Sequence, residues 1–487
     1  MNDWILVCGG DGEIVANASE MLSASVSRLS GKPLPSVPEN DRDAVNSNNV
    51  ICIGRVGQGV IGRCESAGVV SVPAEDDGYS IFIGRSIFNC ERQMICIAGR
   101  TDGGVLYGCA DLCNRYFGDV IYRGRDLWCD DTYDAPFSHA LPEWSVSCSP
   151  AVKTRAVWTW GHVIYDYRGF FRNMARLRLN EIVIWNDHAP LNADAVVDFA
   201  HSLGIKVIWG FSWGWSTSCR DDFDNFGAER MKALKAEIIA RYTEEYANIK
   251  GDGIYFQSFT EFGADREKGR RVAETVTELV NVTACELLSM YPDLHIQFGL
   301  HATSVKDNLD VIARVDPRIY VVWEDCGAFP YAYDPSNISR FEETEAFTEK
   351  LLSLRGGNER FGAVLKGMLK LDWTRFEHSK ERIVLGERDG AFIRERQIKK
   401  NRIWKIIQSG WLKNAGYAAR VISLIAKRSE SPVVEALIED ALLENRIMFP
   451  AALYAELLWD PDADVAELIG RVAKYPCVCF ANTEVDA

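Results

Sequence analysis

From Thr154 onward, short apolar runs alternate with amphipathic stretches, and this alternation restricts the possible folds more than any other feature of the chain. The apolar runs have the length and the Ile, Val and Phe content of buried strands, and helical patterns such as 193–203, 228–246 and 268–290 fill the intervals. Strands that alternate with helices form parallel βαβ units. The alternation predicts seven strands, at Thr154–Trp160, Glu181–Asn186, Lys206–Phe211, Gly253–Phe259, His295–Gly299, Ile319–Trp323 and Phe361–Lys366.

This number of strands predicts an α/β protein built on a (β/α)8 barrel of the TIM type, with an open doubly wound sheet as the structural alternative. The eighth strand is not evident in the sequence. The stretch after Asp372 is charged and irregular, and the pattern is helical from Gln397 almost to the end. The barrel is therefore expected to be incomplete or to have a degenerate last strand.

The chain divides into four predicted parts. Residues 1–129 are expected to form a small α/β domain, because Ile- and Val-rich runs are separated there by Gly and Asp turns. Residues 130–152 contain three prolines and predict a linker. Residues 153–396 would form the barrel, and residues 397–487 a helical C-terminal region. The small domain is expected to have strands at Trp4–Cys8, Asn48–Ile53, Tyr79–Ile83 and Met94–Ala98, helices at Val15–Leu29 and Gly104–Phe117, and an extended piece at Val120–Trp128.

Charge and cysteine usage limit the partners. The net charge of −15 argues against nucleic acid or an anionic membrane as the main partner, since both require a basic surface. The 14 cysteines include no C-x-x-C pair, and neither a leader-like segment nor a membrane-length apolar run is visible. We therefore expect a cytoplasmic protein, and the sequence leaves homo-oligomerisation open.

Tryptophan followed by polar residues recurs where the predicted strands end. Aromatic rings stack on the C–H faces of sugars, and Asn, Asp, His and Glu bind their hydroxyl groups. A barrel mouth with this lining suits carbohydrate, whereas any single tryptophan could instead belong to the core. The candidate substrate-binding residues are Trp160, Asn186, His188, Trp213, Gln257, His301, Trp323, Asp372 and Trp373.

Carboxyl groups at the same strand ends indicate hydrolysis of a glycosidic bond, which needs one acid and one base or nucleophile. Glu261 follows the fourth strand, Glu324 and Asp325 end the sixth, and Asp372 follows the seventh. We predict that Glu261 is catalytic and that Glu324 or Asp325 is its partner. Two alternatives stay open: a non-catalytic carbohydrate-binding barrel, and a metal-dependent hydrolase. His162, His188 and His301 show no H-x-H or H-E-x-x-H spacing, so neither a metal nor another cofactor is expected.

Two segments resemble parts of two-domain glycoside hydrolases. The segment Ala98–Gly118 reads AGRTDGGVLYGCADLCNRYFG, and its Gly104, Tyr107 and Gly108 form a G-x-x-Y-G motif. It resembles the end of the small N-terminal domain of the α-glucuronidases and β-hexosaminidases, in which that domain is an accessory to a catalytic barrel. The segment Leu453–Tyr475 resembles a helix-turn-helix that closes the barrel of some large bacterial glycoside hydrolases, which implies that Asp460 caps a helix beginning at Pro461.

The resemblance also implies roles for individual residues. In the α-glucuronidases a glutamate on the fourth strand is the general acid, which corresponds to Glu261, and carboxylates on later strands assist an attacking water. Hexosaminidases that use the substrate's acetamide group carry two adjacent acids at this position. Here Thr260 precedes Glu261, so that pair is absent. Arg155 lies where such enzymes often place a ligand for a sugar hydroxyl.

Overall fold

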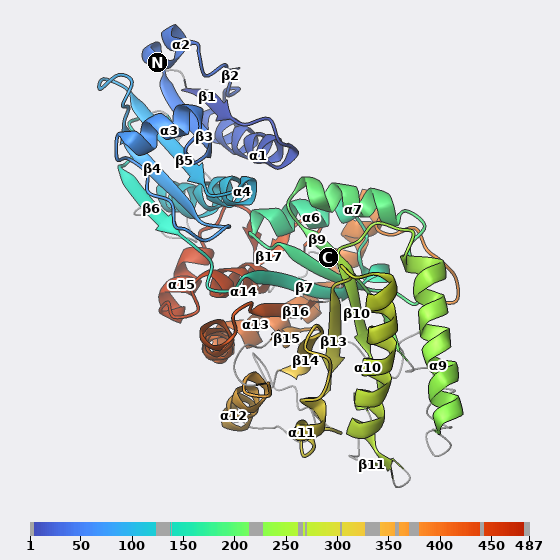
Figure 1. Ribbon diagram of the computed structural model, residues 1–487. Coiled ribbons are helices and arrows are strands. Elements are labelled where there is room, and N and C mark those ends of the chain that lie inside the picture. The colour runs from blue at the N-terminus through green and yellow to red at the C-terminus, as the bar shows by residue number, and fades with distance from the viewer. Residues whose placement is uncertain are drawn as a thin grey trace.

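The computed structural model describes residues 4–122, 137, 139–213, 227–261, 266–267, 270–301, 304–326, 341–355, 360–369, 379–438 and 443–481. A small domain built on one sheet packs against one end of a larger barrel (Figure 1). The eight barrel strands close into a ring in which all neighbours are parallel, in the order β10-β13-β14-β15-β16-β7-β8-β9. The predicted (β/α)8 barrel is therefore confirmed. Its strands are β7 (Thr154–Trp160), β8 (Glu181–Trp185), β9 (Lys206–Ser212), β10 (Gly253–Gln257), β13 (Ile296–Leu300), β14 (Tyr320–Cys326), β15 (Phe361–Met368) and β16 (Val433–Ile438).

The eighth strand, β16, lies inside the region that was predicted to be helical. It pairs with β15 on one side and with β7 on the other, so the barrel extends well beyond residue 396. The sequence Val-Val-Glu-Ala-Leu-Ile contains good helix formers and follows the long helix α13 (Gly390–Arg428), which explains why the strand was missed. The missed signal is the interruption at 429–432, Ser-Glu-Ser-Pro, where the helix ends.

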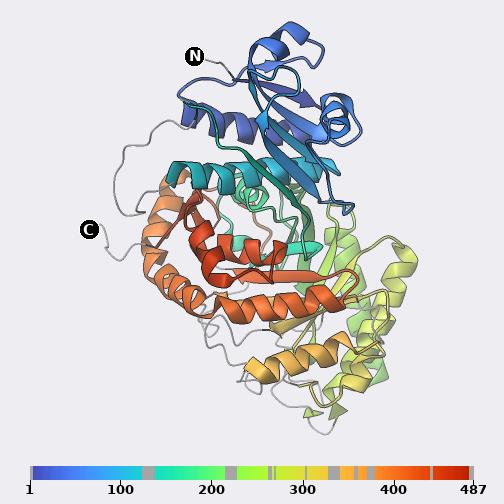
Figure 2. The same ribbon diagram turned by 90° about the vertical axis from the view of Figure 1, so that its left-hand side faces the viewer.

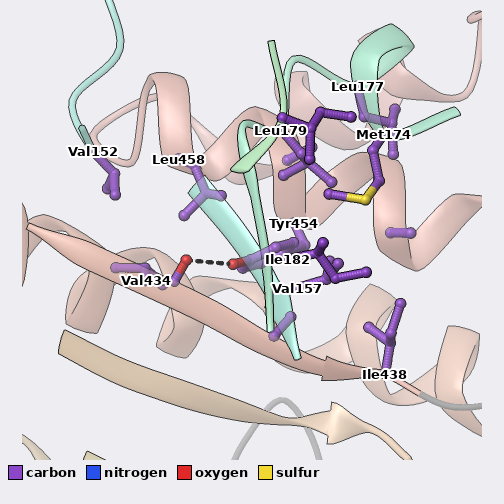
Figure 3. Close-up of a cluster of buried hydrophobic side chains, with 14 of the residues drawn as sticks. Val152, Val157, Met174, Leu177, Leu179, Ile182, Val434, Ile438, Tyr454 and Leu458 are labelled. Carbon is purple, nitrogen blue, oxygen red and sulfur yellow. Dashed lines mark hydrogen bonds between the residues drawn. The ribbon is translucent and has the colours of Figure 1, made fainter. Parts of the chain in front are cut away.

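Helices surround the barrel and shield its outer face. The hydroxyl of Tyr454 on α14 lies 2.8 Å from the carbonyl oxygen of Ala156 and 3.0 Å from that of Val434, so its single hydrogen is shared between β7 and β16 at their seam. Figure 3 shows the contact with Val434. The long helix α13 runs along the outside of the barrel (Figure 2) and contacts β15 and α14. The other helices of the barrel are α6 (Tyr167–Arg176), α7 (Ala193–Ser202), α9 (Ala228–Arg241), α10 (Val272–Met290), α11 (Leu309–Ile312) and α12 (Phe341–Leu352), with α14 at Phe449–Trp459 and α15 at Val465–Val472.

The N-terminal domain has a mixed sheet in the order β2-β1-β3-β5-β4-β6. Its last strand, β6, falls within the predicted linker and pairs antiparallel with β4, so residues 144–148 belong to the domain. The predicted extended piece from Val120 is also wrong in its described part, where the chain is helical. The elements are β1 (Trp4–Gly9), α1 (Glu13–Ser30), β2 (Ser36–Val37), α2 (Arg42–Ser47), β3 (Asn49–Arg55), α3 (Gly59–Ser66), β4 (Tyr79–Arg85), β5 (Gln93–Gly99), α4 (Asp102–Asp111), α5 (Phe117–Tyr122) and β6 (Trp144–Cys148).

The G-x-x-Y-G motif lies on α4, where the helix packs tightly on the sheet. A Cβ atom on Gly104 would lie 2.6 Å from the carbonyl oxygen of Gly78, and one on Gly108 would lie 2.6 Å from Ile97. Because such distances are far below van der Waals contact, only glycine allows this close approach of helix and sheet. The motif therefore has a structural explanation that involves no ligand.

Two buried arginines join the domain to the N-terminal end of the barrel. Arg155, near the start of β7, pairs with Asp77 at 2.7 Å and also donates to the carbonyl group of Arg178. Arg178 pairs with Asp111 of α4 at 3.6 Å and with Glu456 of α14, and its guanidinium stacks on Trp459. Buried charges of this kind need partners, and both arginines find them across the interface.

The C-terminal helices correct one detail of the sequence analysis. Asp460 follows the end of α14, whereas the cap of α15 is Asp464, whose carboxylate accepts from the backbone N–H of Glu467 at 2.9 Å.

Within the described residues, no helix is both long and apolar enough to cross a membrane. Four two-residue strands complete the structure: β11 (Arg266–Glu267), β12 (Arg270–Arg271), β17 (Ile447–Met448) and β18 (Val478–Cys479).

Candidate active site

Alternation along the strands decides which tryptophans face the barrel interior. Trp158 and Trp160 of β7, Trp185 of β8 and Tyr255 of β10 belong to the interior cluster. The ring of Trp158 meets Trp160 edge-on at 5.0 Å and stacks on Trp185 at 5.9 Å. Two adjacent strands therefore give the upper barrel an aromatic wall.

Other tryptophans at the strand ends point outward, between the strands and the helices. Trp213 stacks on Phe256 at 3.8 Å, and Trp323 packs edge-on against Phe347 of α12 at 5.1 Å. Both side chains are fully buried in the outer layer of the core. The expectation that Trp213 and Trp323 bind substrate is corrected here, because each belongs to the face of its strand that is turned away from the mouth.

Arg155 also lies away from the mouth. Its side chain is fully buried at the N-terminal end of β7, where it contacts Asp77, Tyr107 and Trp459. A residue near the start of a barrel strand cannot reach a ligand above the strand's carboxyl end. Arg155 therefore holds the two domains together, and the implied role as a sugar ligand is corrected.

A polar group lies on the wall opposite the tryptophans. Glu324 of β14 is only 2% exposed, and its Oε1 accepts a hydrogen bond from the side-chain amide of Gln257 on β10. Its Oε2 lies 2.7 Å from Nε2 of His301, which follows β13. The backbone N–H of His301 donates to the hydroxyl of Thr260 at 3.1 Å, which ties the ends of β10 and β13 together. The structure thus brings together three predicted site residues from three strands.

The surroundings of Glu324 favour its ionised form. Burial by itself would raise the pKa of this carboxyl, but the charge and the hydrogen bond of His301 oppose it, as do the charge of Lys366 and the hydrogen bond from Gln257. Together these contacts lower the pKa of Glu324 below its ordinary value. A buried carboxylate that stays charged at the end of a barrel strand can act as a base, as a nucleophile or as a stabiliser of positive charge.

Lys366 and Glu435 are inward-facing charged residues that the sequence analysis did not select. Lys366 of β15 shares the inward face of its strand with Val364, and its charge acts on both Glu324 and Glu435. Glu435 of β16 is fully buried, and neither carboxyl oxygen has a hydrogen-bond partner among the described residues. Burial first, and then the negative charges of Glu181 and Glu324, raise the pKa of Glu435 well above its usual range, so this group stays protonated. The sequence signal for Lys366 was a charged residue inside an apolar strand run. Glu435 was not selected because its strand, β16, was not predicted.

A pocket of about 220 Å³ opens beside the aromatic wall. Asn186 and His188, which follow β8, both line it; Nδ1 of His188 lies 3.2 Å from the carboxylate of Glu245. The side-chain amide nitrogen of Asn186 is buried and has no hydrogen-bond partner among the residues that the structure describes. The lining residues are Trp160, His162, Trp185, Asn186, Asp187, His188, Ser379, Glu381 and Ile383.

The segment 379–389 crosses this side of the mouth and forms one edge of the pocket. Its backbone and side chains bond to the loops after β7 and β8: the N–H of Ser379 donates to Asp187 at 2.6 Å, and the guanidinium of Arg382 donates to the carbonyl group of Ala189 at 2.8 Å. Further along, the N–H of Arg388 donates to the carbonyl group of Tyr165 at 2.7 Å. From residue 379 the charged stretch that follows Asp372 is a strap bonded to the barrel mouth, and it leads into α13.

Several predicted residues lie wholly or partly outside the described residues. Glu261 ends a short 3-10 helix (η6, Phe259–Glu261) after β10, but its side chain lies outside the described part, as does that of Asp325 on β14. Asp372 and Trp373 lie outside it altogether. Their roles stay predictions. Among the described residues, no group of three or more His, Cys, Asp and Glu side chains could hold a metal ion.

Comparison with known proteins adds little. No protein-family model matches the chain, and no curated protein is similar to it. Among solved structures, the chain is similar to a β-galactosidase from the psychrophilic Marinomonas ef1, with a TM-score of 0.37 and 11% sequence identity. The similarity covers 65% of this chain and 61% of that enzyme, so the chain spans less than two thirds of that enzyme's length. The functional assignment therefore has to come from the site itself.

Proposed function

We propose that this protein is a glycoside hydrolase whose catalytic site is the mouth of the barrel. The observation that carries the proposal is the position of the buried Glu324 carboxylate, which Gln257 and His301 hold on the wall opposite the aromatic one, in surroundings that lower its pKa. An aromatic surface opposite a fixed anion is the arrangement that a sugar ring and its developing positive charge require.

In the proposed mechanism, Glu324 is the anionic member of the catalytic pair. Gln257, His301 and Lys366 keep it charged, and His301 and Gln257 also fix its orientation. The oxocarbenium-like transition state carries positive charge next to this carboxylate, which therefore stabilises the transition state more than the neutral substrate. The carboxylate would either attack the anomeric carbon or remove a proton from the attacking water.

Glu261 is proposed as the general acid that protonates the departing oxygen. This role is supported by the position of Glu261 after the fourth barrel strand and by the resemblance to the α-glucuronidases. Thr260 precedes Glu261, so the acid pair of the acetamide-dependent hexosaminidases is absent. The separation of the two carboxyl groups would decide the outcome: about 5 Å for retention of configuration, and roughly 6.5–9.5 Å for inversion.

A panel of aryl glycosides in both anomers tests the proposal: glucuronide, N-acetylglucosaminide, glucoside and galactoside. The wild type should hydrolyse at least one of them, and both Glu324→Gln and Glu261→Gln should lose about 10²–10⁴-fold in kcat. Glu278→Gln, an exposed glutamate on α10, is the matched control and should keep full activity.

A non-catalytic carbohydrate-binding protein is the second candidate, and the aromatic wall favours it because stacking alone needs no acid. The same panel separates the two candidates. A binding protein would bind sugars without hydrolysing any member of the panel, and neither glutamine substitution would change a rate.

A further inference from the structure

The pocket between the ends of β7 and β8 and the strap at 379–389 combines part of the aromatic wall with polar side chains, Asn186, Asp187 and Glu381, that the proposed chemistry does not use. We propose that it is a subsite for one uncharged sugar ring of the substrate and that it excludes rings carrying a carboxylate or a phosphate. This inference deepens the proposed function and rests on it, because it concerns the specificity of the same mouth.

The first observation is the side chain of Asn186. It is 7% exposed, and its buried amide nitrogen finds no hydrogen-bond partner within the described part of the chain. An unpaired buried donor destabilises the folded protein, and a ligand hydroxyl that accepts from it recovers this cost. The side chain can take this position because residue 161 is glycine: a Cβ atom there would lie 2.1 Å from Oδ1 of Asn186.

The second observation is the shape and the walls of the pocket. Trp160 and Trp185 provide aromatic surface beside the amide of Asn186. The volume of about 220 Å³ is below the roughly 300 Å³ at which pockets for drug-sized ligands begin, so the pocket fits one small ring rather than a chain. Aromatic surface next to a directed polar group is the combination that binds a sugar ring.

The third observation is the charge of the lining. Asp187 and Glu381 contribute carboxylates, while the described lining residues include neither lysine nor arginine. Carboxylates accept hydrogen bonds from sugar hydroxyls, but they repel a uronate or a sugar phosphate. Glu381 is exposed, so salt weakens its repulsion and the discrimination should be strongest at low ionic strength.

The position of the pocket separates it from the chemistry. In the ring of strands, β8 lies four places from β14 in either direction, so Trp185 and Glu324 stand on opposite walls. A ring bound in the pocket would therefore be held away from the carboxylate that acts on the bond. The pocket would select the substrate, and Asn186 would be a specificity residue rather than a catalytic one.

Calorimetric titration of the Glu324→Gln protein, in which turnover is removed, tests the subsite directly. The probes are two pairs: methyl glucoside is compared with glucuronate, and methyl galactoside is compared with galacturonate. At low salt we expect at least one methyl glycoside to bind and its uronate to bind at least about tenfold more weakly. Adding Asn186→Ala should weaken binding of the glycoside about tenfold, which corresponds to about 1.4 kcal/mol for the lost contact.

Two matched controls accompany this titration. Asn248→Ala removes an exposed asparagine in the turn beyond the end of α9 and should leave binding unchanged. Glu381→Gln should reduce the discrimination against the uronate, whereas Glu387→Gln, in the same strap but paired with Arg168 outside the pocket, should not.

The outcomes separate this inference from the proposed function. The subsite is overturned if no methyl glycoside binds, if Asn186→Ala leaves its affinity unchanged, or if the uronate binds as tightly as the neutral glycoside. If the wild type binds a glycoside through Asn186 but hydrolyses none, the subsite is supported and the proposed hydrolase function is rejected. If the wild type hydrolyses a glycoside and Asn186→Ala leaves its KM unchanged, the subsite is rejected and the proposed hydrolase function is retained.

Discussion

Replacing Glu181 with glutamine should make the barrel more stable at alkaline pH. Glu181 is the first residue of β8 and is almost completely buried, and its Oε1 accepts a hydrogen bond from the side-chain amide of Gln297 at 2.9 Å. Burial raises the pKa of this carboxyl to about 7, although the contact with Gln297 and the charge of Lys206 oppose the rise. In glutamine the amide oxygen can still accept from Gln297, and no charge forms at any pH.

The sign and the size of the effect follow from linkage between protonation and folding. The folded protein holds this proton more tightly than the unfolded chain, in which the pKa is 4.5. The stabilising contribution of the protonated group is therefore complete below pH 4.5 and is lost as the pH rises through about 7. The difference between the two pKa values corresponds to roughly 3 kcal/mol of unfolding free energy.

Urea unfolding followed by tryptophan fluorescence, at several pH values between 5 and 8.5, measures this prediction. The unfolding free energy of the wild type should fall relative to that of Glu181→Gln by up to about 3 kcal/mol across this range. The exposed substitution Glu278→Gln should run parallel to the wild type. A constant difference between wild type and Glu181→Gln at all pH values would refute the reasoning, because it would mean that Glu181 titrates alike in the folded and the unfolded chain.

Three further substitutions test other parts of the structure. Gly161→Ala places a methyl group against the side chain of Asn186 and should lower the affinity for a methyl glycoside about tenfold, with little change in Tm; unchanged calorimetric affinity would contradict the geometry of the pocket. Arg178→Met removes the arginine partner of the buried Asp111, while Glu456 keeps only Arg471, and it should cost about 3–5 kcal/mol in urea unfolding. Arg168→Met, at an exposed ion pair, should cost less than about 1 kcal/mol, and equal costs would argue against the interface. Trp323→Phe changes only the outer core, so steady-state kinetics should give a KM within about twofold of the wild type, and a large rise in KM would place this ring in the mouth after all.

The barrel was predictable from the sequence because its parallel strands are buried on both faces and therefore read as continuous apolar runs. The eighth strand escaped prediction because Glu435, Ala436 and Leu437 favour a helix when they are considered locally. They form a strand because β15 and β7 need a neighbour to close the ring. Tertiary pairing overrode local propensity in this segment.

The site was only partly predictable, because strand-end position alone does not fix the direction of a side chain. Glu324 faces the mouth and Trp323 faces α12, although they are adjacent, since a shift of one residue reverses the face of a strand. Asn186 and Trp160 could be proposed from position, but the pocket that they share also needs the strap at 379–389, which is distant in sequence. The partner of Arg155 comes from the other domain, and no local pattern indicates that contact.

The most direct test of the central claim is the rate of aryl glycoside hydrolysis by the wild type and by Glu324→Gln, with calorimetric binding of a methyl glycoside measured on both proteins. The proposed function predicts that the substitution lowers kcat by about 10²–10⁴-fold while sugar binding persists. Equal hydrolysis by the two proteins, or sugar binding without hydrolysis by the wild type, would contradict the assignment of this barrel mouth as a glycosidase site.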